Sequence, residues 1–140
     1  ALIAPTYPTD SPLRGVSSSL TIGSWAPKIS ELAIDLNNTV TMREDTTTAS
    51  GYHSAVITDR LPQVTIDPEF ALVATEDIFG QWLSATERAL SVAANAGSDS
   101  LTISAGGFQV INPQFGDRNG LSITQIQAQL NDDDMTFTFA

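Results

Sequence analysis

Apolar and polar residues alternate with a period of two along most of this chain, and this pattern constrains the fold more than any other feature. Successive side chains of a β-strand point to opposite faces, so the alternation predicts strands that each bury one face. It recurs nine times in the sequence, at residues 30–36, 40–44, 52–59, 63–67, 88–95, 101–104, 107–113, 121–130 and 135–139. We therefore expect a mainly β protein, a β-sandwich or barrel of about eight or nine strands.

Turn residues divide these strands. Asn37-Asn38-Thr39 predicts a hairpin turn between the first two strands, because Asn tolerates a positive φ at little cost. Residues 116–120 predict a glycine-flanked turn, and residues 132–134, all Asp, predict an acidic one. Within residues 121–130 the apolar phase slips by one at Gln125, which indicates a β-bulge.

One segment has a helical period instead. Ile78, Phe79, Trp82 and Leu83 form a single apolar stripe at helical spacing. Thr75 precedes them as a candidate N-cap, and acidic residues follow it in the first turn. The pattern predicts one helix over about residues 75–84, flanking the β-structure.

The chain length and the proline distribution predict one folded domain with an extended start. At 140 residues the chain is long enough to bury a core. Residues 1–16 are rich in proline, which predicts a linker or extended arm, and residues 17–140 are expected to form a single β-sandwich domain.

Charge excludes several classes of partner. The chain has 16 acidic and 6 basic residues, a net charge of −10, and such a field repels phosphates and anionic lipid. No apolar run reaches the roughly 20 residues that a membrane helix needs, so no membrane partner is expected. Because the chain has no cysteine, disulfides, thiol catalysis and thiolate metal sites are excluded.

The sequence offers no strong catalytic or metal-binding motif. His53 is the only histidine, and no Gly-x-Ser-x-Gly turn accompanies it. The Asp run at residues 132–134 lacks the ligand spacing of a calcium loop, so solvated turn residues explain it better. Paired carboxylates for glycoside hydrolysis would need an apolar environment that the surrounding residues do not provide. We expect no enzyme activity, no cofactor and no bound metal.

Several short motifs resemble those of the tail tube (major tail) proteins of long-tailed bacteriophages and prophages. They are Asp35-Leu36-Asn37-Asn38 at a strand end, Ile57-Thr58-Asp59-Arg60-Leu61-Pro62 at a turn, residues 116–121 as a glycine-bounded turn, and residues 135–139 as a final Thr/Phe strand. The similarity spans about residues 5–140. The stretch at residues 4–10 is similar to the connection that follows an N-terminal domain in larger members, which implies a C-terminal domain of a two-domain tail protein.

This resemblance implies a structural virion protein, made in the bacterial host cytoplasm and assembled into the phage tail. It implies homo-oligomeric rings, expected to be hexamers, that stack into a tube with other phage tail proteins and carry DNA only as passing cargo. Acidic residues facing the lumen would repel that DNA. The candidates on polar strand faces are Glu31, Asp35, Asp59 and Asp67. The candidate inter-subunit loop, at the tip of a hairpin, comprises Asp45, Thr46, Thr47, Thr48 and Gly51.

A second hypothesis is a β-sandwich binding module for a carbohydrate or a cell-surface partner, displayed on a virion or a secreted protein. Such a module needs an exposed aromatic platform, for which Trp25 and Tyr52 are the candidate pair.

Overall fold

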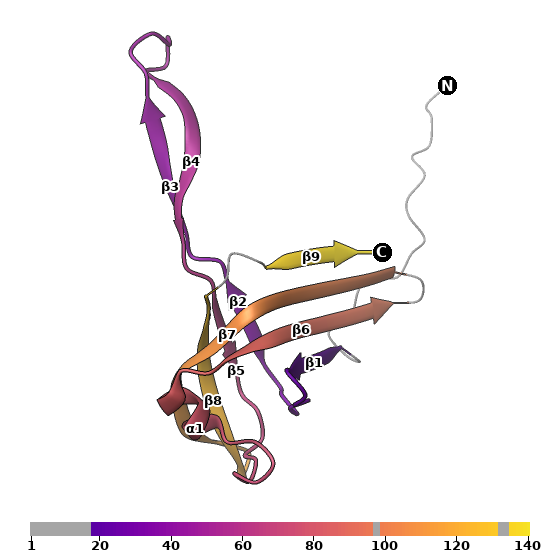
Figure 1. Ribbon diagram of the computed structural model, residues 1–140. Coiled ribbons are helices and arrows are strands. Elements are labelled where there is room, and N and C mark those ends of the chain that lie inside the picture. Colours follow the sequence, from indigo (N-terminus) through magenta and orange to yellow (C-terminus); the bar gives the residue numbers. More distant parts are fainter. Residues whose placement is uncertain (1–17, 97–98, 132–134) are drawn as a thin grey trace, which may run out of the picture.

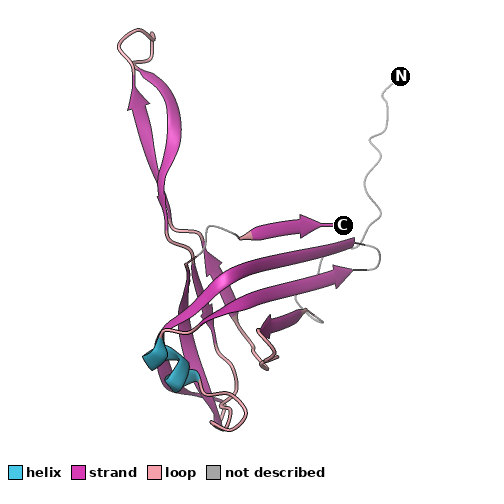
Figure 2. Ribbon diagram, viewed as in Figure 1, coloured by secondary structure: helices cyan, strands magenta, loops and turns pink. Residues whose placement is uncertain are grey.

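The computed structural model describes residues 18–96, 99–131 and 135–140. Over these residues the chain forms nine strands and one helix (Figures 1 and 2). In chain order they are β1 (Ser19–Ile22), β2 (Leu32–Asp35), β3 (Asn38–Glu44), β4 (Tyr52–Arg60), β5 (Gln63–Ile66), α1 (Ile78–Ser84), β6 (Glu87–Ala96), β7 (Asp99–Arg118), β8 (Leu121–Leu130) and β9 (Thr136–Phe139). The predicted mainly β class with one short helix is confirmed. Residues 1–16 and the Asp run at 132–134 lie outside the described residues.

Seven strands form one sheet that curls into a half-barrel (Figure 1). The strand order is β1-β6-β7-β8-β5-β2, and β9 pairs with β7 beside this path. Strand β7 is 20 residues long and belongs to both halves of the sheet. Its first part pairs with β6 and β9, and its second part pairs with β8. The two strands predicted at residues 101–104 and 107–113 are therefore segments of one strand.

The core lies on the concave side of this curled sheet. Buried residues of five strands and Ile78 of the helix fill it, and partly buried Leu32 and Ile34 of β2 pack against them. Each of the Val, Leu, Ile and Phe side chains among them stabilises the fold by roughly 1.5–3 kcal/mol when fully buried. The buried apolar residues are Leu20, Ile22, Val64, Ile66, Ile78, Leu90, Val92, Ala105, Phe108, Val110, Ile126, Ala128 and Leu130.

The predicted bulge at Gln125 is wrong, because the irregularity lies in the neighbouring strand. Strand β8 pairs without interruption from Leu121 to Gln127, whereas Val110 and Asn112 of β7 pair with successive residues of β8 and leave Ile111 as the extra residue. The apolar phase slips because Ile123 is buried on the other face of β8. It occupies space that Gly116 leaves open, since a Cβ on Gly116 would lie 3.1 Å from the Ile123 side chain.

The predicted hairpin turn at residues 37–39 is also wrong. Strand β2 pairs with β5, and β3 pairs with β4 in a separate two-stranded sheet. Asn37 does take a positive φ of 44°, and its side-chain amide donates to the Leu61 carbonyl, so it redirects the chain from one sheet to the other. Leu32 and Ile34 face the core, which is why β2 belongs with β5.

The helix is shorter than predicted and begins at a different residue. Asp77 is the N-cap, because its carboxylate accepts a hydrogen bond from the Gly80 N–H at 2.9 Å. Thr75 lies in the preceding turn, where its N–H donates to the Leu72 carbonyl. Of the predicted apolar stripe only Ile78 is buried, whereas Trp82 and Leu83 are exposed. The stripe therefore leaves apolar surface uncovered.

Arg88 of β6 connects the segment before the helix to strand β1. The alternation did not predict β1. The Arg88 guanidinium forms an ion pair with Glu76 and donates to the Ile22 carbonyl of β1 at 2.5 Å. Both side chains of the ion pair are largely buried. The guanidinium thus provides a hydrogen-bond donor for the carbonyl at the end of β1 and a counter-charge for the buried Glu76 carboxylate. Because Glu76 lies in the loop before α1, these contacts position that loop.

Two phenylalanines of β7 test this account of the core. Phe108 is 2% exposed and Phe115 is 70% exposed. We expect Phe108→Ala to lower the free energy of unfolding by about 3–5 kcal/mol, as for other buried phenylalanines. Phe115→Ala should cost about 1 kcal/mol or less, because most of that ring is already in water. Urea unfolding of both variants measures the difference, and equal losses would contradict the assignment of the core.

Candidate functional site

The hairpin of β3 and β4 projects away from the half-barrel as a separate two-stranded sheet (Figure 1). All residues of β3, and all of β4 except the half-buried Ser54, are exposed. The predicted inter-subunit loop at residues 45–51 forms the tip of this hairpin. Two-stranded ribbons are at best marginally stable in water on their own, so this element is suited to binding against another surface.

Hydrogen bonds within the tip give it a defined shape. The Asp45 carboxylate accepts from the Thr47 hydroxyl at 2.6 Å and from the Thr47 N–H at 2.8 Å. These two bonds lower the pKa of Asp45. Thr48 donates its hydroxyl to the Asp45 carbonyl, and Gly51 takes a φ of 75° that closes the loop.

The hairpin has one apolar face. The pairs Val40–Ile57 and Met42–Ala55 place four apolar side chains side by side on it. Val40 is 60%, Met42 52% and Ile57 46% exposed. The opposite face carries Thr41, Arg43, Ser54 and Val56. An exposed apolar strip of this kind marks a surface that binds a partner.

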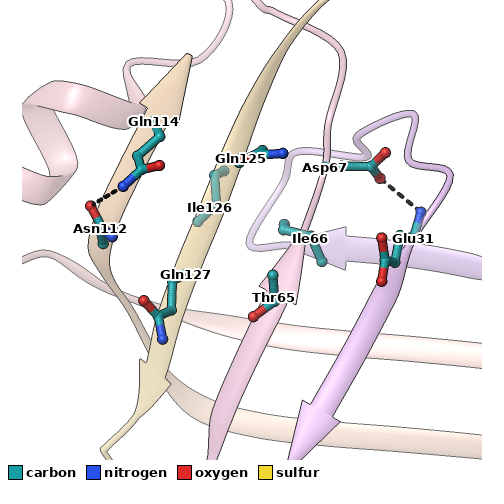
Figure 3. A pocket seen from close by; sticks show the side chains of 9 residues that line it. All are labelled: Glu31, Thr65, Ile66, Asp67, Asn112, Gln114, Gln125, Ile126 and Gln127. Carbon is teal, nitrogen blue, oxygen red and sulfur yellow. Dashed lines mark hydrogen bonds between the residues drawn. The ribbon is translucent and has the colours of Figure 1, made fainter. Parts of the chain in front are cut away.

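A second surface lies on the face of β2, β5, β8 and β7 that points away from the core. We call it the polar face. Strand register places its residues in rows across the four strands. Neutral amides predominate, and a 330 Å³ hollow lies among them (Figure 3). The residues are Glu31, Asp35, Gln63, Thr65, Asp67, Gln109, Asn112, Gln114, Gln125, Gln127 and Gln129.

Three of the four acids predicted to face a lumen lie on this polar face. Glu31 and Asp35 flank the ends of β2, and Asp67 follows β5 beside Glu31. The fourth, Asp59, lies at the base of the hairpin, where it pairs with Thr39 and accepts from the Arg60 N–H. The structure thus places Glu31 beside Asp67, puts Asp35 on the same face but at the other end of β2, opposite Gln63, and leaves Asp59 apart from them.

Asp67 has a structural role in the polar face. Its carboxylate accepts from the Ser30 N–H at 2.8 Å, the Ser30 hydroxyl at 2.5 Å and the Glu31 N–H at 2.7 Å, and it pairs with Arg118 at 2.7 Å. Burial alone would raise the pKa of Asp67, but the bonds from Ser30, Glu31 and Arg118 lower it to about 2. The carboxylate therefore joins the start of β2 to β5 and β7.

The sequence analysis did not predict that amide side chains would share one face, although their spacing in the sequence indicates it. Gln125, Gln127 and Gln129 occupy every second position of β8, and Asn112 and Gln114 do the same in β7. Gln127 donates to the Gln63 side chain at 3.2 Å across the strands. In the described part of the polar face the one cation is Arg118, and it is neutralised by Asp67 and Glu69.

Trp25 and Tyr52, the candidate aromatic platform, lie in different parts of the fold. Trp25 packs against the core, whereas Tyr52 is in the projecting hairpin. His53 is exposed on the same hairpin. Across the described ranges no group of three or more His, Cys, Asp or Glu side chains is arranged to hold a metal ion. Among these residues no helix has the length and apolarity needed to span a membrane.

Comparison with known proteins identifies the fold through solved structures. No protein-family model and no curated protein matches the chain. A chain of the tube terminating cap of the anti-feeding prophage superposes with a TM-score of 0.66 at 15% identity, covering 100% of this chain and 97% of that one. A chain of the PVC sheath-tube complex, an extracellular contractile injection system in its extended state, gives 0.70 at 10% identity, covering 94% and 95%.

A chain of a gene transfer agent virion is also similar, with a TM-score of 0.62 at 9% identity, covering 91% of this chain and 98% of that one. The expected tail-tube type of fold is confirmed by these structures. They do not address an N-terminal domain before this one, which stays a prediction.

The contacts of Asp67 predict a specific loss of stability in acid. Because its pKa in the folded protein is about 2, below the ordinary value near 4, its contribution is complete above pH 4 and is lost as the pH falls toward 2. We expect Asp67→Asn to lower the free energy of unfolding at pH 7 by about 1–3 kcal/mol. The difference from the unmodified protein should shrink between pH 4 and pH 2. Urea unfolding across this pH range measures the difference in unfolding free energy, and a difference that stays constant with pH would contradict this role of Asp67.

Proposed function

We propose that this protein is a structural subunit of a phage-type tail tube, whose copies form rings that stack into a hollow conduit. The observation that carries the proposal is the hairpin, a projecting ribbon with an exposed apolar face on a fold shared with chains of tube and cap assemblies. The chain acts by assembly rather than by catalysis, and it needs no cofactor. Its other partners are further tail proteins, and it is made in the host cytoplasm before entering the virion.

Ring formation uses the edges of the sheet. Strands β2 and β9 each have a single partner strand, so each keeps one backbone edge free within the described sheet. Strand β1 also has one partner strand, but Ile22 at its end is hydrogen-bonded to Trp25. Strand β9 reads Thr-Phe-Thr-Phe and carries no charge that would oppose pairing. Edge-to-edge joining of neighbouring copies closes a ring, for which we propose six copies, and the hairpins then connect one ring to the next.

The polar face lines the lumen in this proposal. Its acids repel DNA, its amides carry no net charge, and its one described cation is already paired. No free cation of this face is therefore available to neutralise phosphates and release their condensed counterions, which is the main source of non-specific DNA affinity. DNA passes through such a conduit without being retained.

Two neighbouring residues of β4 provide a matched test of stacking. Ile57 lies on the apolar face of the hairpin and Val56 on the opposite face, with exposed fractions of 46% and 41%. We expect Ile57→Thr to raise the protein concentration needed for tube assembly about tenfold, through loss of apolar burial worth roughly 1–1.5 kcal/mol. Val56→Thr should leave it unchanged. Negative-stain electron microscopy and sedimentation measure assembly, and a wild-type chain that forms neither rings nor tubes would overturn the proposal.

The absence of cysteine in the sequence allows a direct test of which face lines the lumen. We expect a cysteine introduced by Gln125→Cys, on the polar face, to react with a bulky polyethylene-glycol maleimide in monomers but much more slowly in tubes. Asn95→Cys, at an exposed position of β6, should react at similar rates in both states. Gel-shift kinetics measure the reaction, and protection at residue 95 without protection at residue 125 would exclude the polar face from the lumen.

A further inference from the structure

The hollow in the polar face has two chemically different walls. Glu31 and Asp67 lie on one side of it, and amide side chains of β7 and β8 lie on the other (Figure 3). Its volume of 330 Å³ is enough for the end of a long side chain. What it can bind depends on which of its hydrogen-bonding groups are still unused. The amides that line it are those of Asn112, Gln114, Gln125 and Gln127.

The amides present unused acceptors to the hollow. The side-chain nitrogen of Gln127 donates to Gln63 at 3.2 Å, and that of Gln114 donates to Asn112 at 3.4 Å. Within the described residues, the side-chain oxygens of Gln114 and Gln127 receive no hydrogen bond. Gln125 pairs with Gln114 across the strands, and its own amide has no partner there, so it can turn its oxygen toward a ligand.

Glu31 gives the hollow a negative charge that no described residue neutralises. The Asp67 carboxylate is already engaged with Ser30 and Arg118, whereas the Glu31 carboxylate has neither a donor nor a cation as its partner among the described residues. Strand register places Glu31 and Gln125 on either side of Asp67, one residue beyond the paired residues of β2, β5 and β8. Because neighbouring strands lie only about 5 Å apart, both side chains can reach one small group between them.

This chemistry excludes most classes of ligand. Phosphates and carboxylates are repelled by Glu31 and by the net charge of −10. A sugar would find no aromatic ring to stack on in the hollow and would leave the Glu31 charge unpaired. In the described part of the chain, no three His, Cys, Asp or Glu side chains are grouped to hold a metal ion. A cation with several N–H donors fits, and the guanidinium of arginine has five such donors in one plane and no acceptor.

We propose that this hollow binds the guanidinium of an arginine side chain from another polypeptide, with Glu31 as its ion-pair partner and the amide oxygens of Gln125 and Gln127 as further acceptors. A basic polypeptide complements a chain of net charge −10, whereas a second copy carries the same net charge. The site lies on a single chain, so it does not depend on ring formation. In the tube the hollow opens into the lumen, and this location alone rests on the function proposed above.

Peptide binding to the full chain tests the charge of the site. In about 150 mM salt, which screens long-range attraction, Glu31→Gln should raise the Kd of a hexa-arginine peptide at least fivefold. Glu44→Gln removes the same charge from the exposed hairpin and should change this Kd less than twofold. Fluorescence anisotropy of the labelled peptide measures both values. Equal effects of the two variants would assign the binding to the net charge of the chain and overturn the proposal.

Changes in the peptide test the guanidinium itself. Citrulline has the length of arginine but is neutral, so a hexa-citrulline peptide should bind at least tenfold more weakly than the hexa-arginine peptide. A hexa-lysine peptide keeps the charge but lacks the planar set of donors, and its Kd should be at least threefold higher. If either peptide bound as tightly as hexa-arginine, the assignment to a guanidinium would be wrong.

Two glutamines of β8 test the amide contacts. Gln125 lines the hollow, and Gln129 lies outside it on the same face. Gln125→Leu should raise the Kd of the hexa-arginine peptide about threefold, as expected for the loss of one hydrogen bond, and Gln129→Leu should leave it unchanged. Urea unfolding checks that both variants are folded. The same Kd for both would overturn the proposed part of the amides.

Sedimentation with and without the hexa-arginine peptide separates this site from the tube function. A chain that binds the peptide through Glu31 but never forms rings would support the site and overturn the tube function. Tubes from a chain that does not distinguish arginine from citrulline would do the reverse. If the peptide dissolved the tubes and Arg43→Gln also prevented their assembly, the occupant would be the exposed arginine of a second copy, and the proposal of a separate polypeptide would be overturned.

Discussion

The rest of the structure depends on the continuity of β7 through a bend. The first part of β7 lies in the middle of one half of the sheet, and its second part forms the border of the other half. A single extra residue, Ile111, separates the two registers. The bulge changes which alternate residues face inward, so Phe108 and Val110 point to the core while Asn112 and Gln114 point to the polar face. If Ile111 were paired regularly and not bulged, the alternation from Val110 would place the amides of β7 in the core.

The half-barrel buries its core but leaves three features without a partner among the residues that the structure describes. They are the free sheet edges, the apolar face of the hairpin, and the exposed aromatic surface around Phe115. A soluble monomer rarely exposes so much apolar surface in separate places. Because these surfaces lie on different sides of one molecule, repeated contacts between identical copies account for them better than a single partner does.

The sequence predicted most strands well, because alternation in the half-barrel reflects the burial of one face. In β3 and β4 the same alternation occurs although nearly all of their residues are exposed. The sequence did not identify the strand partners. The pattern in β2 fits either a hairpin with β3 or pairing with β5, and only the core packing of Leu32 and Ile34 decides between these two pairings. The bulge was placed one strand away for a similar reason, because Ile123 is buried on the second face of β8. Of the candidate sites, the predicted loop residues lie at the hairpin tip and three of the predicted acids lie on the polar face, and their roles stay predictions. The burial of Thr124 without a hydrogen-bond partner among the described residues depends on tertiary contacts that no sequence pattern reports.

The acidity of the chain does not act uniformly. Asp67 is committed to Ser30, Glu31 and Arg118, so it holds the fold together and contributes little free negative charge to the polar face. What distinguishes this face is its lack of an unpaired cation in its described part rather than a dense array of acids. For the proposed conduit the lack of free cations matters more than the acids, because repulsion between like charges weakens with salt, whereas a surface without free cations offers phosphates no cationic partner at any ionic strength.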